Sequence, residues 1–141
     1  MLRVQRLSVY LLAAILLMAC NQPSKSEQSA EINSQSAIEL VSVAQVAERL
    51  SHDATIVLDI RTAKEFEAGR IRGALNIDYF AEDFKQRIDA LDKSSTYIVH
   101  CESDGRSGRS MEIFQALGFQ NILHLKSGFS GWQQAGLPIE K

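Results

Sequence analysis

The chain has 141 residues, of which 45% are hydrophobic and 23% charged, and its formal net charge is −2 at pH 7. This length allows one domain beside an N-terminal segment that does not join the core. No basic stripe with interleaved aromatic residues is visible, so the composition argues against nucleic acid as a partner.

The first 19 residues have the layout of a secretory signal peptide. Two arginines precede an apolar run at 7–18, and the small residue Ala19 follows the run. The run is too short to cross a bilayer, which needs about 20 residues. The stretch from Leu17 to Cys20 resembles a bacterial lipobox, which implies that Cys20 receives lipid and begins the mature chain. A plain secretory signal or an uncleaved anchor is the alternative.

Residues 20–37 are expected to form a lipidated cysteine and a flexible tether. The segment 21–37 contains five serines and three glutamines, and such a composition cannot offset the entropy lost on ordering. We therefore expect a lipid-anchored protein of the cell envelope, on the periplasmic face of a membrane. The lipobox resemblance favours the outer membrane if the organism has two membranes, because Asn21 rather than Asp follows the cysteine.

The remaining residues, 38–141, alternate short apolar runs with helical patterns, and this alternation predicts an α/β fold. Strand, helix and strand in sequence favour a small parallel sheet covered by helices on both faces. Ligands bind such sheets beyond the carboxyl ends of the strands. The predicted elements are a strand at 38–41, a helix at 43–50, a strand at 55–58, a helix at 62–68, a brief strand at 74–77, a helix at 80–91, a strand at 97–99, a helix at 107–117 and a strand at 122–125.

Cys101 stands at the end of the predicted strand 97–99, before a glycine-containing loop and a helix start. Backbone N–H groups of residues 102–106 can face a common concavity, and the helix adds its positive end. Both effects favour an anion and lower the pKa of a thiol there, and Arg106 and Arg109 add positive charge. Cys101 is therefore the candidate nucleophile, and a small buried core cysteine is the alternative.

Three segments resemble the rhodanese family, and they run in the family's order across most of residues 55–139. Cys101, four residues, Arg106 and then Ser-Gly-Arg resemble the active-site loop. LDIRTAKEFEAGRIRGALNI upstream resembles the family's first signature, and GFSGWQQAGLPI downstream resembles its closing segment. The resemblance implies a single rhodanese-like domain at 38–141.

The same resemblance implies a sulfurtransferase. The Cys101 thiolate would take a sulfane sulfur from a donor such as thiosulfate, become a persulfide, and pass the sulfur to a thiol or cyanide. It implies neither a metal nor an organic cofactor, and it leaves room for a protein as sulfur acceptor. The implied anion-binding loop consists of Glu102, Ser103, Asp104, Gly105, Arg106 and Ser107, with support from Asp59, Arg61 and Arg109.

The loop departs from the family pattern in its charge. Glu102 and Asp104 place carboxylates near the thiolate, which opposes anion binding, so thiosulfate is expected to be a poor donor. Arg70 and Arg72 replace the family's usual His and Pro and are expected to return positive charge to the rim.

Two other functions stay open. One is a non-enzymatic carrier or binding module that presents its persulfide to a partner. The other is a cysteine phosphatase or arsenate reductase, whose loop has five residues between cysteine and arginine, against four here. No role is assigned to His100, and His52 and His124 have no partners at ligand spacing. Phe129 and Trp132 are interpreted as core residues.

Overall fold

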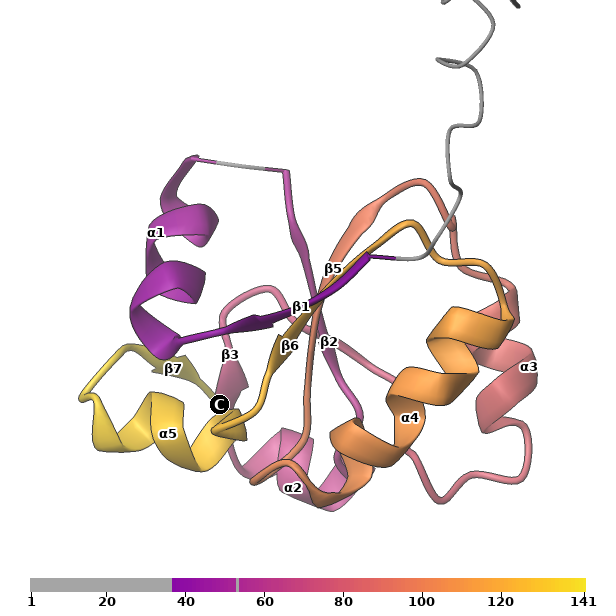
Figure 1. Ribbon diagram of the computed structural model, residues 1–141. Coiled ribbons are helices and arrows are strands. Elements are labelled where there is room, and N and C mark those ends of the chain that lie inside the picture. Colours follow the sequence, from indigo (N-terminus) through magenta and orange to yellow (C-terminus); the bar gives the residue numbers. More distant parts are fainter. Residues whose placement is uncertain (1–36, 53) are drawn as a thin grey trace, which may run out of the picture. The chain divides into compact units, whose positions relative to one another are not determined.

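The computed structural model describes residues 37–52 and 54–141, so the predictions for the signal peptide, Cys20 and the tether lie outside the described residues. Figure 1 shows how the elements are arranged. Among the residues described, no helix is long and apolar enough to cross a membrane. The elements in chain order are β1 (Ala37–Val41), α1 (Val43–His52), β2 (Ile56–Asp59), α2 (Ala63–Ala68), β3 (Arg70–Ile71), β4 (Leu75–Asn76), α3 (Phe84–Asp89), β5 (Thr96–His100), α4 (Gly105–Ala116), β6 (Asn121–Leu125), α5 (Gly128–Gln134) and β7 (Ile139–Glu140).

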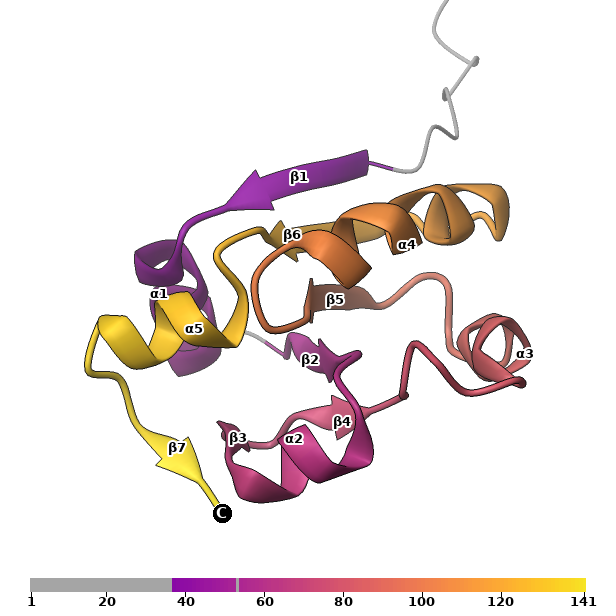
Figure 2. The same ribbon diagram turned by 90° about the horizontal axis from the view of Figure 1, so that it is seen from below.

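A five-stranded sheet in the order β1-β6-β5-β2-β4 forms the centre of the fold, and each neighbouring pair is parallel. Figures 1 and 2 show α3 and α4 on one side of this sheet and α1 and α5 on the other. The predicted α/β fold, with a small parallel sheet and helices on both faces, is confirmed. The strands β3 and β7 form a separate antiparallel pair.

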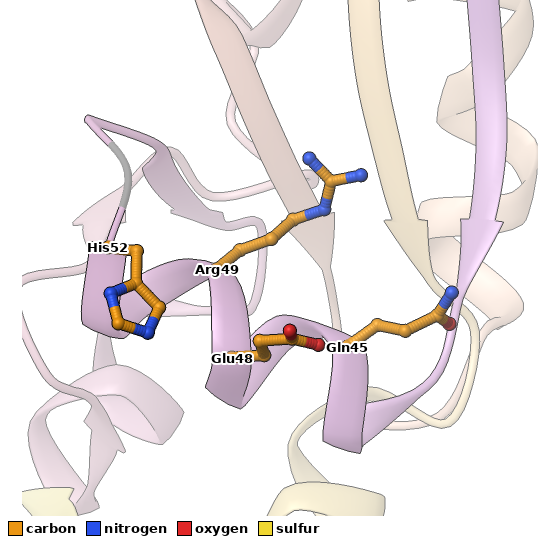
Figure 3. Close-up of a pocket in the computed structure, with 4 residues that line it drawn as sticks. All are labelled: Gln45, Glu48, Arg49 and His52. Atoms are coloured by element: carbon orange, nitrogen blue, oxygen red, sulfur yellow. The ribbon is translucent and has the colours of Figure 1, made fainter.

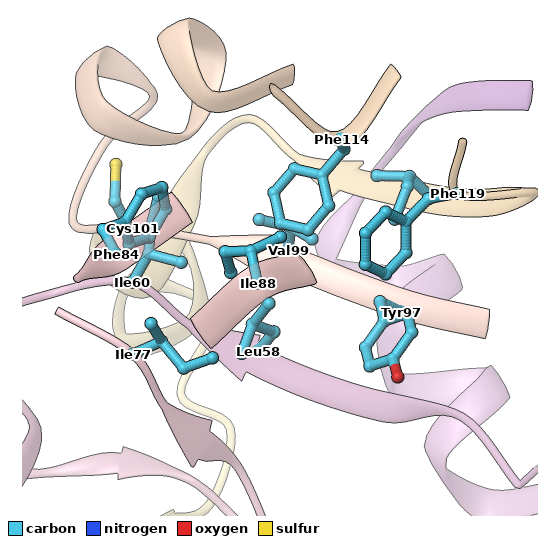
Figure 4. Close-up of a cluster of buried hydrophobic side chains, with 11 residues drawn as sticks. Leu58, Ile60, Ile77, Phe84, Ile88, Tyr97, Val99, Cys101, Phe114 and Phe119 are labelled. Carbon is cyan, nitrogen blue, oxygen red and sulfur yellow. The ribbon is translucent and has the colours of Figure 1, made fainter. Parts of the chain in front are cut away.

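Each face of the sheet has its own hydrophobic core, because successive side chains of a strand point to opposite faces. Tyr97 and Val99 of β5 pack toward α3 and α4, together with Phe114 (Figure 4). Ile98 packs in the other core, with Trp132 of α5 and residues of α1. Burial of each large apolar side chain contributes about 1.5–3 kcal/mol, so the two cores hold β5 from both sides.

The predicted helix at 80–91 is shorter in the structure, where α3 begins at Phe84. The carboxylate of Asp78 accepts a hydrogen bond of 2.9 Å from the N–H of Phe80. Short polar side chains that bond the following backbone favour turns over helix. Phe80 therefore lies in a turn with 66% of its surface exposed.

Candidate functional site

The carboxyl ends of three neighbouring strands bring the candidate residues together. Cys101 directly follows β5, and Asp59 ends β2 opposite His100 in the register. His124 lies near the end of β6, which pairs with β5 on its other side. A site at the carboxyl edge of a parallel sheet is the position expected for this architecture.

The residue Cys101 is 1% exposed, and its thiol lies against the first turn of α4. Its Sγ atom is 3.3 Å from Ser107 Oγ, and the N–H of Ser107 donates to it over 3.4 Å. Burial raises the pKa of the thiol, but the hydroxyl of Ser107 and the N–H groups of Ser107, Ser103 and Arg106 outweigh burial, so the pKa lies below its usual value. The surroundings of Cys101 favour the reactive thiolate.

Helix α5 holds the two residues that begin the loop. The N–H groups of Phe129 and Ser130 donate to the carbonyl oxygens of Cys101 and Glu102 over 2.9 and 3.0 Å. Gly128 makes this close approach, with φ +63°, and a Cβ atom there would overlap the carbonyl of Glu102 and lie 2.6 Å from that of Cys101. Only glycine fits this position without a shift of the backbone.

The guanidinium of Arg61 connects Asp59 to the loop. It donates to both carboxylate oxygens of Asp59 at 2.7 to 3.0 Å, to the carbonyl of Gly69 at 2.7 Å, and to Glu102 Oε2 at 3.3 Å. It also lies 3.8 Å from the centre of the Phe129 ring. Asp59 and Arg61 are both buried, and Arg61 links Asp59 to the loop residue Glu102.

Arg106 is engaged by an acidic partner that the sequence did not suggest. Its guanidinium makes two hydrogen bonds to the carboxylate of Glu65, of 2.7 and 2.8 Å. The hydrogen bond from Arg106, with help from Thr62, lowers the pKa of Glu65 to about 2. Arg106 was expected to offer free positive charge to an anion, but Glu65 neutralises that charge.

The acidic residues of the loop are also paired. Glu102 accepts from Ser130 Oγ at 2.6 Å as well as from Arg61. Asp104 adopts φ +84° and directs its carboxylate to the end of β6, with Oδ1 3.5 Å from His124 Nε2 and Oδ2 3.7 Å from Lys126 Nζ.

Several predicted residues lie elsewhere than expected. Gly105, Arg106 and Ser107 belong to the first turn of α4 and not to the loop. Arg109 is exposed on α4, and within the described part of the chain it makes no hydrogen bond or ion pair that would support the loop. Arg70 and Arg72 lie near Glu140, at 3.7 and 3.4 Å, which shares their charge.

His100, for which no role was predicted, is fully buried. Its Nδ1 is 3.0 Å from the carbonyl of Cys101, which can only accept, so Nδ1 carries the proton. Burial lowers the pKa of His100, although Asp59 opposes this effect. A neutral imidazole therefore packs against Phe129, with the two rings stacked at 6.4 Å.

A surface pocket on α1 is lined by Gln45, Glu48, Arg49 and His52 (Figure 3). None of these residues contacts Cys101 or its loop through a hydrogen bond or ion pair in the described part of the chain. The same residues form no group of three or more side chains suited to hold a metal ion.

The sequence of this chain is similar to a known family model and to proteins from other organisms. The family model of the rhodanese-like domain matches residues 42–135. The uncharacterized protein slr1261 of Synechocystis is 34% identical over 63% of this chain, and the match spans about half (49%) of that protein's length. The thiosulfate sulfurtransferase GlpE of Actinobacillus succinogenes is 36% identical over 60% of this chain and 75% of its own length.

Solved structures agree with this match. The crystal structure of a rhodanese-related protein from Thermoplasma volcanium superposes with a TM-score of 0.65 at 25% identity. The superposition covers 72% of this chain and 97% of that chain.

Proposed function

Because this chain belongs to the rhodanese-like domain family, we propose that it is a sulfurtransferase in which Cys101 carries the transferred sulfur as a persulfide. One observation carries the proposal. The Cys101 thiol meets the hydroxyl and N–H of Ser107 at a helix start, and its pKa is lowered there. The same hydrogen-bond donors would stabilise the anions of each step.

The proposed cycle has two halves. In the first, the Cys101 thiolate forms a bond to the outer sulfur of the donor, the S–S bond of the donor breaks, and the leaving group departs with the electron pair. With thiosulfate the leaving group is sulfite. In the second half a thiol or cyanide attacks the outer sulfur of the persulfide, and the Cys101 thiolate leaves. Thiocyanate forms when cyanide is the acceptor.

The charge around the loop favours a donor that carries less charge than thiosulfate. The paired groups include three cations and four carboxylates, so they offer no excess positive charge to a dianion. We therefore propose an organic persulfide, whose sulfur carries at most one negative charge, as a better donor than thiosulfate. The groups are Arg61, Arg106, Lys126, Asp59, Glu65, Glu102 and Asp104.

The test uses the full chain and peptide mass spectrometry without reducing agent. Incubation with an organic persulfide, polysulfide or thiosulfate, each of which contains an S–S bond, should add one sulfur atom to the Cys101 peptide. Subsequent addition of cyanide should remove that sulfur and yield thiocyanate. The Cys101→Ser variant is the control and should gain nothing. If no donor modifies Cys101, the proposal is wrong.

A persulfide carrier is the second candidate, because neutralised arginines give little affinity for small anionic donors. In this case Cys101 would accept and release one sulfur but show negligible turnover with small acceptors. A mixed disulfide between Cys101 and a protein, trapped after the sulfur is loaded, would favour the carrier. Hydrolysis of an aryl phosphate, lost in Cys101→Ser, would instead favour the phosphatase reading, although the bond to Glu65 leaves Arg106 poorly placed to bind a phosphate.

We also propose that Cys20 anchors the protein to an envelope membrane by attached lipid, with two or more acyl chains for stable binding. The support is the pattern that ends at Cys20, which lies outside the described residues. Metabolic labelling with a fatty acid should mark the full chain and not the Cys20→Ser variant. Equal labelling of both would contradict the anchor.

A further inference from the structure

A buried histidine beside the nucleophile has no function in the proposed cycle. His124 of β6 is 4% exposed, and its Nε2 lies 3.0 Å from Ser107 Oγ. The same hydroxyl oxygen lies 3.3 Å from Cys101 Sγ. Ser107 therefore connects the thiol to the imidazole through a single hydroxyl group.

The groups around His124 determine whether it accepts a proton. Asp104 Oδ1 lies 3.5 Å from Nε2 and favours the charged imidazolium. Lys126 follows on the same chain segment and disfavours it, while Leu40 and Val99, its neighbours across the sheet, carry no charge. Burial is the largest effect and lowers the pKa of His124, with Asp104 opposing and Lys126 adding. His124 is thus a neutral base at neutral pH.

Resting on the proposed function, we propose that Ser107 and His124 form a proton relay that takes up the proton of Cys101 as its sulfur attacks, with Asp104 stabilising the proton on His124. The Cys101 S–H gives its proton to Ser107 Oγ, and the hydroxyl proton of Ser107 passes to His124 Nε2. The products are a thiolate, an unchanged serine and an imidazolium, so one proton has moved and no other reactant is needed.

The hydrogen bonds available to Ser107 permit this direction in one tautomer of His124. The hydroxyl has one proton, and its neighbours are Cys101 Sγ, His124 Nε2 and the carbonyl of Asp104 at 3.2 Å. The carbonyl can only accept, so the single serine proton goes either to Asp104 or to His124. In the proposed relay His124 carries its proton on Nδ1, so its Nε2 accepts the serine proton in place of the carbonyl, and Ser107 Oγ accepts from the thiol. Ser107 touches the reacting sulfur, whereas His124 and Asp104 act through it as positioning residues.

The first experiment measures the rate at which iodoacetamide alkylates Cys101 between pH 5 and pH 9 in the full chain. Peptide mass spectrometry reads Cys101 alone, so Cys20 does not contribute. In the native protein, alkylation should persist below the pH at which a lone thiol ionises, down to the pH at which His124 itself becomes protonated, because the relay supplies thiolate over that range. His124→Gln should lower the rate at pH 6 by about tenfold, and should leave a rate that simply follows ionisation of a lone thiol. The matched control is His52→Gln, on the exposed surface of α1, which should change nothing.

Two substitutions should change the alkylation rate of Cys101 in opposite directions, a result that a purely structural role would not produce. Asn tolerates the positive φ of residue 104, so Asp104→Asn removes the charge and keeps the backbone. In the relay it should slow alkylation at pH 6, and Lys126→Gln should speed it. If Asp104 merely repelled the thiolate and Lys126 merely attracted it, both signs would be reversed, and the relay would be wrong. These two variants test the relay even if His124→Gln does not fold.

The double variant tests the order of the relay. If His124 acts through Ser107, adding His124→Gln to Ser107→Ala should cause no further loss, whereas independent effects would add. An unchanged pH profile in His124→Gln overturns the relay but leaves persulfide formation intact. A native protein that shows the relay but gains no sulfur from any donor overturns the proposed function and leaves the relay standing.

Discussion

Gly128 offers a direct test of how α5 holds the loop that carries Cys101. Gly128→Ala forces an L-residue into the left-handed region, which costs about 1–2 kcal/mol. The new Cβ atom would also overlap the loop carbonyls, so the two hydrogen bonds from Phe129 and Ser130 would be lost. Each of those bonds contributes about 1 kcal/mol. Together we expect a loss of about 3 kcal/mol in the free energy of unfolding.

The assay is urea unfolding followed by circular dichroism, with thermal melts as a second measure. For a domain of about 100 residues, the expected loss lowers the Tm by about 12 °C or more. Gly136→Ala is the matched control, since Gly136 also has a positive φ, +68°, but a Cβ atom there meets nothing within 4 Å. Equal losses in the two variants would refute the reasoning, because the contact with the loop would then contribute nothing.

Three further substitutions test the ion pairs that flank the loop. Arg61→Met should cost about 3–5 kcal/mol in urea unfolding, because it leaves the Asp59 carboxylate buried without a cationic partner. Adding Asp59→Leu should restore much of the loss, and no restoration would contradict this. Glu65→Gln should lower stability at pH 6 by about 1 kcal/mol, a figure reduced for the partial exposure of the pair. The pKa of Glu65 is about 2 in the folded protein and its usual value is 4.5, so its contribution is present above pH 4.5 and is lost as the pH falls toward 2. The variant should therefore lose less stability than the native protein over that range, and parallel curves from urea unfolding at pH 6 and pH 3 would argue against the assignment. Gln can still cap α2, so the same variant should release Arg106 and lower the KM for thiosulfate, and an unchanged KM would show that the ion pair does not limit donor binding.

The strands and the helix around Cys101 were predictable because their apolar runs are buried on two faces. The start of α4 was predicted two residues late. Asp104 ends the loop with its positive φ, and its carbonyl accepts from the N–H of Gly108 as the first helical bond, so Gly105 and Arg106 are already helical. The residue types at positions 105 and 106 do not predict this helix start, because it depends on the backbone conformation of Asp104.

Other elements lacked a sequence signal. β3 and β7 contain two residues each, and they are far apart in the sequence although Arg70 and Glu140 are paired in space. Two-residue strands show no alternation to detect. The helix α5 contains two glycines and is short, so no helix was predicted there, although its buried Phe129 and Trp132 were correctly interpreted as core.

The contacts that tune the site depend on topology rather than on local pattern. Glu65 and Arg106 are 41 residues apart, and His124 and Ser107 are 17 apart. His124 interrupts an apolar strand, which was the one available signal, yet a buried histidine in a strand more often only packs. Its role emerges only when β6 is placed beside β5, because that pairing brings Nε2 to the hydroxyl of Ser107.

The hydrogen bonds from α5 and Ser107 to Cys101 and its loop determine which sulfur of a persulfide an acceptor can reach. A persulfide adds one S–S bond of about 2 Å, and the inner sulfur would remain in the position that is 1% exposed in the free thiol. Because the backbone at residues 101 and 102 is bonded to α5, the loop cannot easily retreat to make room, so the outer sulfur must extend toward solvent. An incoming thiol would then meet the outer sulfur first and carry it away. Attack on the shielded inner sulfur, which would leave the acceptor attached to Cys101, would be disfavoured by the same backbone bonds.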